Sequence, residues 1–266
     1  MAQLHRELYN DIETPRLLAV HGVTGHSRRW ERLATETWAA RRVMSVDLRG
    51  HGYSTSAAPW NLEQHARDLI DTLDAEGWEE PVDVVGHSFG AAIAMTLLAL
   101  SPGRIRRLVL LDPALMLDGE DVLETAAATV AFEGFESTAE AADSRLSQLD
   151  PSGHWAVSTE LEQHLAEVES GFYRFRFRVP VVVAAWGEMA RSVPTLAERR
   201  PTLLVRATQA HVCSDGLAAA LRQELGGALF ETDLECGHML YWERFEETGT
   251  LVRDFLSAEV PGLGTT

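Results

Sequence analysis

The chain contains 266 residues, of which 45% are apolar and 24% charged, a composition typical of a globular protein with room for one large α/β domain. It carries 40 acidic residues against 23 basic ones, all of them arginine, so the net charge is −17. This charge repels phosphate and argues against nucleic acid or an anionic membrane surface as a partner. The absence of lysine excludes Schiff-base enzymes, pyridoxal-phosphate enzymes and Walker-type nucleotide loops.

Cysteine usage and apolar stretches bear on the compartment. Cys213 and Cys236 do not form a C-x-x-C pair, so neither a disulfide framework nor a cysteine-built metal site is indicated. A reducing compartment fits this pattern. The first residues lack the apolar core of a signal peptide, and the longest apolar stretch, around 91–100, is too short to span a bilayer. We therefore expect a cytoplasmic protein without a membrane span.

Short apolar runs alternate with helical patterns along most of the chain. Apolar residues recur at helical spacing through 62–73, and residues 89–100 are apolar on nearly every face, which predicts an amphipathic helix and a central one. This alternation predicts a doubly wound, mostly parallel sheet with helices on both faces, an α/β fold. The runs predicted to be buried strands are 16–21, 43–46, 82–85, 108–111, 203–205 and 228–234.

Residues 114–200 interrupt this alternation, because they are helical in pattern, rich in Ala and Glu, and nearly free of strand runs. Helices inserted between two strands of a sheet are most simply a lid over its carboxyl edge. We therefore predict a core domain formed by residues 1–113 and 201–266, and a helical cap formed by residues 114–200. The predicted cap helices are 123–130, 139–149, 161–168 and 180–189, the last with proline in its first turn.

Large apolar residues of the predicted cap are candidates for contact with a substrate. Residues 172–178 alternate aromatic side chains with arginine, so an extended segment would place aromatics on one face, where they could dock the cap or line a pocket. The substrate-contact candidates are Trp155, Phe172, Trp186 and Met189. The sequence alone does not position these side chains.

The strongest signal for chemistry is G-H-S-F-G at residues 86–90, between a predicted strand and a predicted helix. G-x-S-x-G in this context is typical of a nucleophile elbow, where the turn is so tight that small residues must flank the serine. Ser88 is therefore the predicted nucleophile. A serine needs a histidine to take its proton, and His238, in the loop after the last predicted strand, would reach the same edge of the sheet.

Attack of Ser88 on a carbonyl would create an oxyanion, which backbone N–H groups can stabilise. We expect one donor at Phe89, at the helix N-terminus, and a second at Val23, in the loop H-G-V-T-G at residues 21–25. An ordinary glycine-rich turn is the alternative interpretation of this loop.

The motifs at residues 21–22, 47–54, 86–90 and 237–238, with the inserted helices, resemble the α/β-hydrolase superfamily over essentially the whole chain. The resemblance implies the α/β-hydrolase fold, a serine nucleophile, a cap that shapes an acyl or hydrophobic pocket, and no cofactor or metal. It further implies that Asp47 and Arg49 brace their turn by an ion pair. Because few residues precede the first motif, we expect a single antiparallel strand near residues 4–9 instead of the usual two.

The position of the triad acid departs from the family's usual pattern. The loop at 208–215 holds no carboxylate where the family places one, and Asp215, the only acid there, is a ready N-cap for the helix that follows. Some α/β-hydrolases carry the acid at the end of the preceding core strand, where this chain has Asp112. We assign Asp112 as the acid and keep Asp215 as the alternative, since Asp-Pro at a strand's end is also ordinary turn chemistry.

Together these residues predict a serine hydrolase that cleaves a carboxylic ester or lactone of a small hydrophobic or acyl substrate through an acyl-enzyme. A cofactor-free haloperoxidase or perhydrolase, a thioesterase and a C–C hydrolase of the same fold stay open. So does a ligand-binding protein without a working triad, because of the empty acid position. The sequence does not indicate an oligomeric state.

Overall fold

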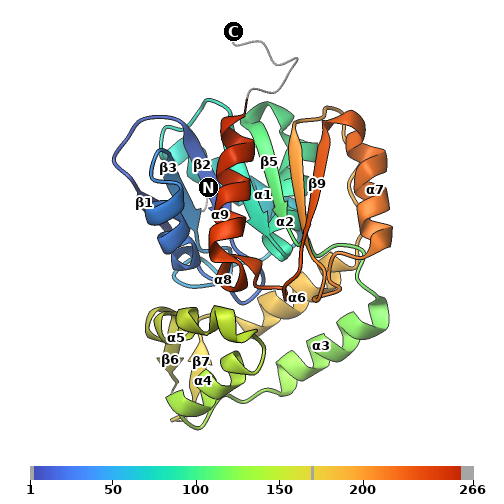
Figure 1. The fold of residues 1–266 in the computed structure, drawn as a ribbon. Coiled ribbons are helices and arrows are strands. Elements are labelled where there is room, and N and C mark those ends of the chain that lie inside the picture. Colours follow the sequence, from blue (N-terminus) through green and yellow to red (C-terminus); the bar gives the residue numbers. More distant parts are fainter. Residues whose placement is uncertain (1–2, 169–170, 259–266) are drawn as a thin grey trace.

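A mostly parallel sheet forms the centre of the computed structural model, which describes residues 3–168 and 171–258 (Figure 1). Within these residues the sheet has seven strands in the order β1-β3-β2-β4-β5-β8-β9. β1 is antiparallel to β3, and every other neighbouring pair is parallel, which confirms the predicted doubly wound sheet and its one antiparallel strand. The strands are β1 Arg6–Tyr9, β2 Arg16–Val20, β3 Arg42–Val46, β4 Val82–His87, β5 Ile105–Leu111, β8 Thr202–Ala207 and β9 Leu229–Leu234.

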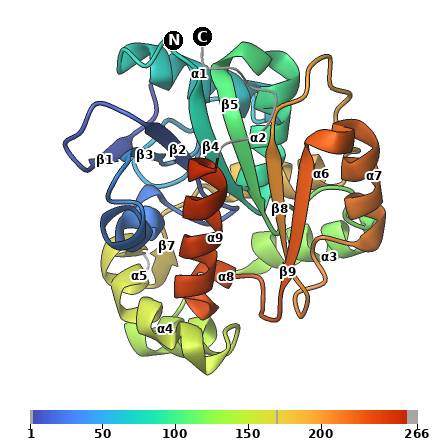
Figure 2. The same cartoon turned by 45° about the horizontal axis from the view of Figure 1, so that its top comes forward.

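Side chains of the central strands alternate between two apolar cores, one on each face of the sheet. In β2, for example, Leu18 and Val20 belong to one core, whereas Leu17 and Ala19 belong to the other. Figure 2 shows helices on both sides of the sheet, with α9 in front of it. The helices that cover the first core are α1 Leu62–Ala75, α2 Phe89–Leu100 and α7 Asp215–Leu225, and those on the second are α8 Leu240–Glu243 and α9 Phe245–Ser257.

The helix that follows β4 is the most buried one, as its apolar composition predicts. All residues of α2 from Phe89 to Leu98 are buried, because the helix lies between the sheet and α1. α1 instead shows one apolar face, and its N-cap is Asn61, whose side chain accepts a hydrogen bond from the N–H of Gln64 at 2.9 Å. The N-terminus of α2 is thereby held rigidly at the carboxyl edge of the sheet.

Between β5 and β8 the chain leaves the sheet and folds below its carboxyl edge (Figure 1). We call residues 114–200 the inserted segment. The predicted helix at 161–168 is wrong in its second half, because the chain becomes extended after His164 and pairs in an antiparallel ladder with β7. The elements of the inserted segment are α3 Gly119–Ala131, α4 Thr138–Leu146, η4 Pro151–Ala156, α5 Val157–His164, β6 Leu165–Glu167, β7 Tyr173–Phe175 and α6 Val179–Met189.

The inserted segment has a small apolar core of its own around β6 and β7. Tyr173, Phe175 and Phe177 all pack in this cluster, so the alternating aromatics do share one face. α3 differs from the other helices of the segment because it packs along α6 without fully burying any residue. Within residues 3–168 and 171–258, no helix combines the length and the apolar character needed to cross a bilayer.

Candidate active site

The turn between β4 and α2 holds Ser88 in a strained conformation, with φ 55° and ψ −120°. The glycines on either side of it have no room for a side chain. A Cβ on Gly86 would lie 2.5 Å from the backbone oxygen of Gly90, and a Cβ on Gly90 would lie 2.4 Å from that of Val20. Because these are backbone atoms of α2 and of the central strand β2, which cannot move aside, glycine is required at both positions, and the turn has the geometry of a nucleophile elbow.

His238 and Asp112 come from different loops at this edge and form a hydrogen bond. Nδ1 of His238 lies 2.6 Å from Oδ2 of Asp112, which directly follows β5 and is fully buried. The other carboxylate oxygen of Asp112 accepts the N–H of Ala207 at 3.2 Å, which fixes the carboxylate plane. An imidazole that donates from Nδ1 carries its lone pair on Nε2 when neutral, the atom that a general base needs.

Asp215, the alternative acid, lies away from this pair. Its side chain is exposed and pairs with Arg206 at 2.7 Å. The prediction that it caps α7 is also wrong, because Ser214 takes the extended N-cap conformation and accepts the N–H of Leu217 at 3.1 Å. Asp215 is instead the first residue of the helix.

The loop that bears Val23 lies directly against the elbow. A Cβ on Gly22 would be 2.9 Å from Cβ of Ser88, so only glycine allows this approach. The N–H of Gly25 donates to the oxygen of Gly22 at 3.0 Å, which closes the loop as a turn. Val23 is therefore next to Ser88 at the cavity, and Phe89, the first residue of α2, directly follows Ser88 in the chain.

Two buried histidines fix this loop. His21 donates from Nδ1 to the oxygen of Gly22 at 2.7 Å and accepts the N–H of Leu48 on Nε2 at 3.0 Å. His51 accepts the N–H of Thr24, a residue with left-handed backbone, at 3.1 Å. Burial lowers the pKa of His51 to about 4 and that of His21 well below its usual value, so both rings stay neutral and keep their acceptor nitrogens.

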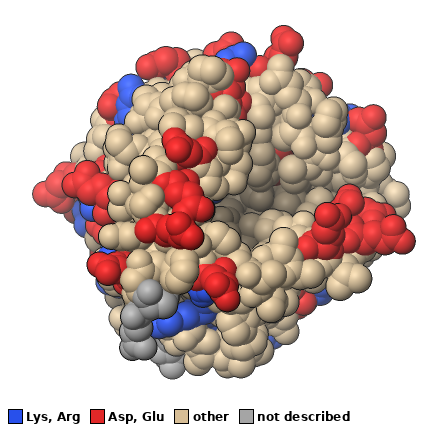
Figure 3. All heavy atoms as spheres, turned by 90° about the horizontal axis from the view of Figure 1, so that it is seen from below, with Lys and Arg blue, Asp and Glu red and all other residues tan. Residues whose placement is uncertain are grey.

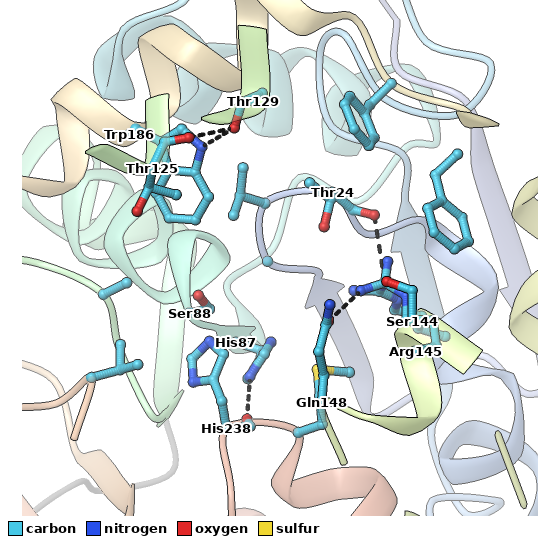
Figure 4. Close-up of a pocket in the computed structure, with 18 of the residues that line it drawn as sticks. Thr24, His87, Ser88, Thr125, Thr129, Ser144, Arg145, Gln148, Trp186 and His238 are labelled. Atoms are coloured by element: carbon cyan, nitrogen blue, oxygen red, sulfur yellow. Dashed lines mark hydrogen bonds between the residues drawn. The ribbon is translucent and has the colours of Figure 1, made fainter. Parts of the chain in front are cut away.

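Ser88 and His238 face a common cavity of about 630 Å³ between the sheet edge and the inserted segment (Figure 4). Its wall is mostly apolar, and Trp186 is held there by a hydrogen bond from Nε1 to Oγ1 of Thr129 at 3.2 Å. Seen from below, the face that carries the inserted segment is hollowed near its middle, and acidic side chains gather on either side of the hollow (Figure 3).

Of the four predicted substrate contacts, only Trp186 lines this cavity in the structure. Trp155 packs edge-to-face on Phe245 and borders a separate cavity of about 260 Å³, and Met189 is fully buried in the main core. Phe172 lies beside Gly134, outside the cavity lining. These three residues do not line the cavity in the structure, because the sequence pattern did not show which way their side chains turn.

The predicted ion pair between Asp47 and Arg49 is wrong. Arg49 instead forms a bidentate pair with Asp68 of α1, at 2.6 and 2.7 Å. The carboxylate of Asp47 accepts the backbone N–H groups of Ser27 at 2.7 Å and Tyr53 at 2.9 Å. Both residues still stabilise the turn, but each side chain does so through partners of its own.

Sequence reasoning missed two features of the site. Glu243 of α8 accepts the N–H of Gly237 at 2.6 Å, next to His238, and so holds the histidine loop. The second is the set of charged side chains along the cavity, all of which are arginines: Arg29, Arg145 and Arg174. The cavity arginines have no local sequence signal, since their placement depends on contacts between distant segments. Across the described ranges, no group of three or more His, Cys, Asp or Glu is placed to hold a metal ion.

Known proteins resemble this chain in sequence and in fold. Residues 15–245 match the protein family described as alpha/beta hydrolase fold. The chain is 38% identical over 259 residues to lipase LipV of Mycobacterium tuberculosis, a match that covers 95% of this chain and 97% of that protein. It is 28% identical over 255 residues to a 2-hydroxymuconate semialdehyde hydrolase of a Pseudomonas species, covering 91% and 86%. Among solved structures, a marine microorganism esterase has a TM-score of 0.79 at 19% identity, covering 96% of this chain and 100% of that one.

Proposed function

Because the chain belongs to the α/β-hydrolase family, we propose that it cleaves a carboxylic ester or lactone through an acyl-enzyme formed on Ser88. The observation that carries this proposal is the 2.6 Å hydrogen bond between His238 and Asp112 at the cavity that Ser88 also faces. The similarity to a protein named as a lipase supports an ester as the substrate.

In the proposed reaction, Oγ of Ser88 attacks the ester carbonyl carbon while Nε2 of His238 takes the serine proton. Asp112 stabilises the resulting imidazolium and keeps its orientation. The N–H groups of Val23 and Phe89 receive the negative charge on the carbonyl oxygen. His238 then gives its proton to the leaving alcohol, and a water molecule repeats the sequence to release the acid and regenerate Ser88.

In the same proposal the inserted segment is a cap that shapes the acyl pocket. Its aromatic side chains, among them Trp186, Phe175 and Phe177, form much of the wall. A cavity with such a wall favours a substrate with an apolar body, because burial of apolar surface contributes about 25 cal/mol per Å².

C–C bond hydrolysis is the second candidate, and the relative named as a 2-hydroxymuconate semialdehyde hydrolase supports it. The same serine, histidine and acid would serve both reactions. Product analysis separates them, since an ester yields an acid and an alcohol whereas a C–C hydrolase yields two carbon fragments. The hydrogen bond of His238 to Asp112 argues against a protein that only binds ligands, because Asp112 would supply the acid that the loop at 208–215 lacks.

Active-site labelling tests the acyl-enzyme directly. A fluorophosphonate should add one adduct per chain, located on Ser88 by peptide mass spectrometry, and His238→Ala should slow this labelling strongly. Ser101→Ala, at the opposite end of α2, is the matched serine control. Hydrolysis of 4-nitrophenyl esters of graded chain length should then depend on Ser88. Retention of more than a few per cent of turnover in Ser88→Ala would contradict the proposal.

A further inference from the structure

The cavity wall is positively charged although the protein as a whole is strongly acidic. Three arginines line the cavity, and no Asp or Glu is among its lining residues, in a chain whose net charge is −17. Two of the three guanidinium groups have good partners. Arg174 donates to the backbone oxygens of Phe132 and Glu133, with the first at 2.8 Å and the second at 2.6 Å.

Arg29 is paired with Glu160 of α5, which is buried. Nε of Arg29 lies 3.1 Å from both oxygens of that carboxylate, and its Nη2 donates to Oε1 as well. His26 donates from Nε2 to Oε2 at 2.7 Å. The lone pairs of the Glu160 carboxylate are therefore already engaged by Arg29 and His26.

Arg145 of α4 has no comparable partner. Its side chain is 16% exposed, and its nearest carboxylate oxygen, on Glu160, is 3.6 Å away. Nη1 reaches Oε1 of Gln148 only at 3.4 Å, and Nε is buried without a hydrogen-bond partner among the described residues. The guanidinium lies over the ring of Phe175, 4.3 Å from its centroid, which fixes its plane.

Arg29 and Arg145 thus share one carboxylate, so one of these two positive charges is left uncompensated at the cavity wall. Burial and the like charge of Arg29 lower the pKa of Arg145 to about 10, so the group is still charged at neutral pH. A largely desolvated charge that shares its one nearby carboxylate with a second arginine is costly, and a bound anion would offset that cost. Arg145 faces the cavity that also holds Ser88, as Figure 4 shows.

We propose that Arg145 binds a carboxylate at the end of the substrate remote from the scissile bond, so that the preferred substrates are half-esters of dicarboxylic acids. This inference rests on the proposed ester hydrolysis at Ser88. A planar guanidinium matches a carboxylate through two parallel hydrogen bonds, and Gln148, 3.4 Å from Arg145, can turn its amide group to donate a third. The apolar wall between the two ends would contact the methylene chain of such a substrate.

A purely structural role for Arg145, joining α4 to α5 through Glu160, is the competing explanation. The 3.6 Å separation and the saturation of Glu160 by other donors argue against it. The two explanations differ in what Arg145→Met does. Loss of a structural ion pair would destabilise the protein, whereas loss of a ligand site would leave the melting temperature unchanged or raise it.

The test compares 4-nitrophenyl half-esters of dicarboxylic acids, from succinate to suberate, with esters in which a carboxamide replaces the free carboxyl group. These two groups have nearly the same shape, so the ratio of kcat/KM between acid and amide isolates the charge. Ser88→Ala protein serves as the blank for spontaneous hydrolysis. We expect a ratio above ten for at least one chain length in the wild type, and the net charge of −17 cannot produce it, because it repels anions.

Arg145→Met should lower this ratio at least tenfold, and Arg145→Lys should retain part of it because the charge remains while the planar fork is lost. Arg174→Met is the matched control, since that arginine lines the same cavity but is satisfied by backbone oxygens. A wild-type ratio at or below one overturns the proposal, as does a ratio that survives Arg145→Met or that falls only in Arg174→Met.

A binding measurement separates failure of this inference from failure of the proposed function. Ser88→Ala protein is titrated with monomethyl adipate by calorimetry, alone and combined with Arg145→Met. Binding that requires Arg145 supports the carboxylate site even if no ester is turned over, whereas the absence of such binding overturns it. Turnover of the amide-ended esters that survives Ser88→Ala would count against the acyl-enzyme and not against Arg145.

Discussion

The ring of His87 donates a hydrogen bond from Nε2 to the backbone oxygen of His238 at 2.8 Å, and the two ring centroids are 4.6 Å apart. His87 directly precedes Ser88, so the elbow itself holds the loop of the candidate base. Because a carbonyl oxygen can only accept, the proton of His87 resides on Nε2. Burial, and then the neighbouring His238, lower the pKa of His87 well below its usual value, which keeps the ring neutral.

Replacement of His87 should affect turnover through the position of His238. His87→Phe keeps a ring but removes the donor, and we expect kcat to fall about tenfold, in line with the loss of one buried hydrogen bond, with a smaller change in KM. His87→Gln places an amide N–H near the same point and should recover part of the loss. Steady-state kinetics on a neutral 4-nitrophenyl ester measures these effects. Equal kcat values for His87→Phe and His87→Gln would show that the hydrogen bond donated by residue 87 does not affect turnover.

The identity of the acid is decided by a pair of matched substitutions. Asp112→Asn should lower kcat by about 10⁴, as in a well-studied serine protease triad, because the amide can stabilise the wrong imidazole tautomer. Asp215→Asn should change kcat little, since its carboxylate is exposed and pairs with Arg206. Both substitutions are nearly isosteric and remove one negative charge, so their comparison isolates position.

The reverse result, a large loss of kcat in Asp215→Asn and a nearly unchanged kcat in Asp112→Asn, would mean that the loop at 208–215 supplies the acid. If both variants stay within about tenfold of the wild type, under roughly 1.4 kcal/mol of barrier, the protein works without either carboxylate. Thermal melting of each variant is the control for folding.

Glycine at the elbow should be irreplaceable for steric reasons. Gly90→Ala would place a methyl group 2.4 Å from the backbone oxygen of Val20, so the strand or the helix must shift. We expect a loss of about 1–3 kcal/mol or more in the free energy of unfolding and a severe loss of turnover. Gly103→Ala is the matched control, because nothing lies within 4 Å of the added group. Denaturant titration measures the free energy of unfolding of both variants, and equal stability of the two would refute the steric argument.

A buried histidine should make the fold sensitive to acid. Neither ring nitrogen of His65 has a hydrogen-bond partner among the described residues, and burial lowers the pKa of this imidazole to about 3. As pH falls below about 6.5 the unfolded chain takes up this proton before the folded one does, so stability decreases down to about pH 3. At pH 5 the cost relative to pH 7 is about 2 kcal/mol.

His65→Leu removes this titrating group and should raise the melting temperature at pH 7, with a larger gain at pH 5. His211→Asn removes an exposed imidazole at a left-handed position that asparagine tolerates, and it is the matched histidine control. Melting curves of the three proteins between pH 5 and pH 8 provide the test. A gain from His65→Leu that is the same at both pH values would contradict the titration argument.

The elements around Ser88 could be predicted from sequence because their signals are local and mutually consistent. The strand 82–85, the glycines of G-H-S-F-G and the apolar helix 89–100 each follow from side-chain size and periodicity within about twenty residues. The structure extends the strand by two residues, to His87, and reproduces the helix bounds. The choice of Asp112 rested on the resemblance to those α/β-hydrolases that carry the acid at the end of the core strand equivalent to β5.

The cavity wall could not be predicted in the same way. Arg145 lies on a short helix of mixed composition, and nothing in its neighbours shows that it turns toward a cavity formed with Ser88. Its relation to Glu160 and Arg29 joins segments more than a hundred residues apart in the chain. Helical periodicity at 161–168 failed for a related reason, since the pairing of β6 with β7 overrides local preference.

The carboxylate of Glu160 also connects helix α5 to the loop that bears Val23. Arg29, which it holds, donates from Nη2 to the backbone oxygen of Thr24 at 3.4 Å, and His164, on the same helix as Glu160, donates to that oxygen at 3.2 Å. A displacement of α5 would therefore reach the loop whose Val23 N–H is proposed to receive the developing negative charge. Substrates that differ in their contacts with the cavity wall around Arg145 would then differ in the rate of bond cleavage as well as in the strength of binding.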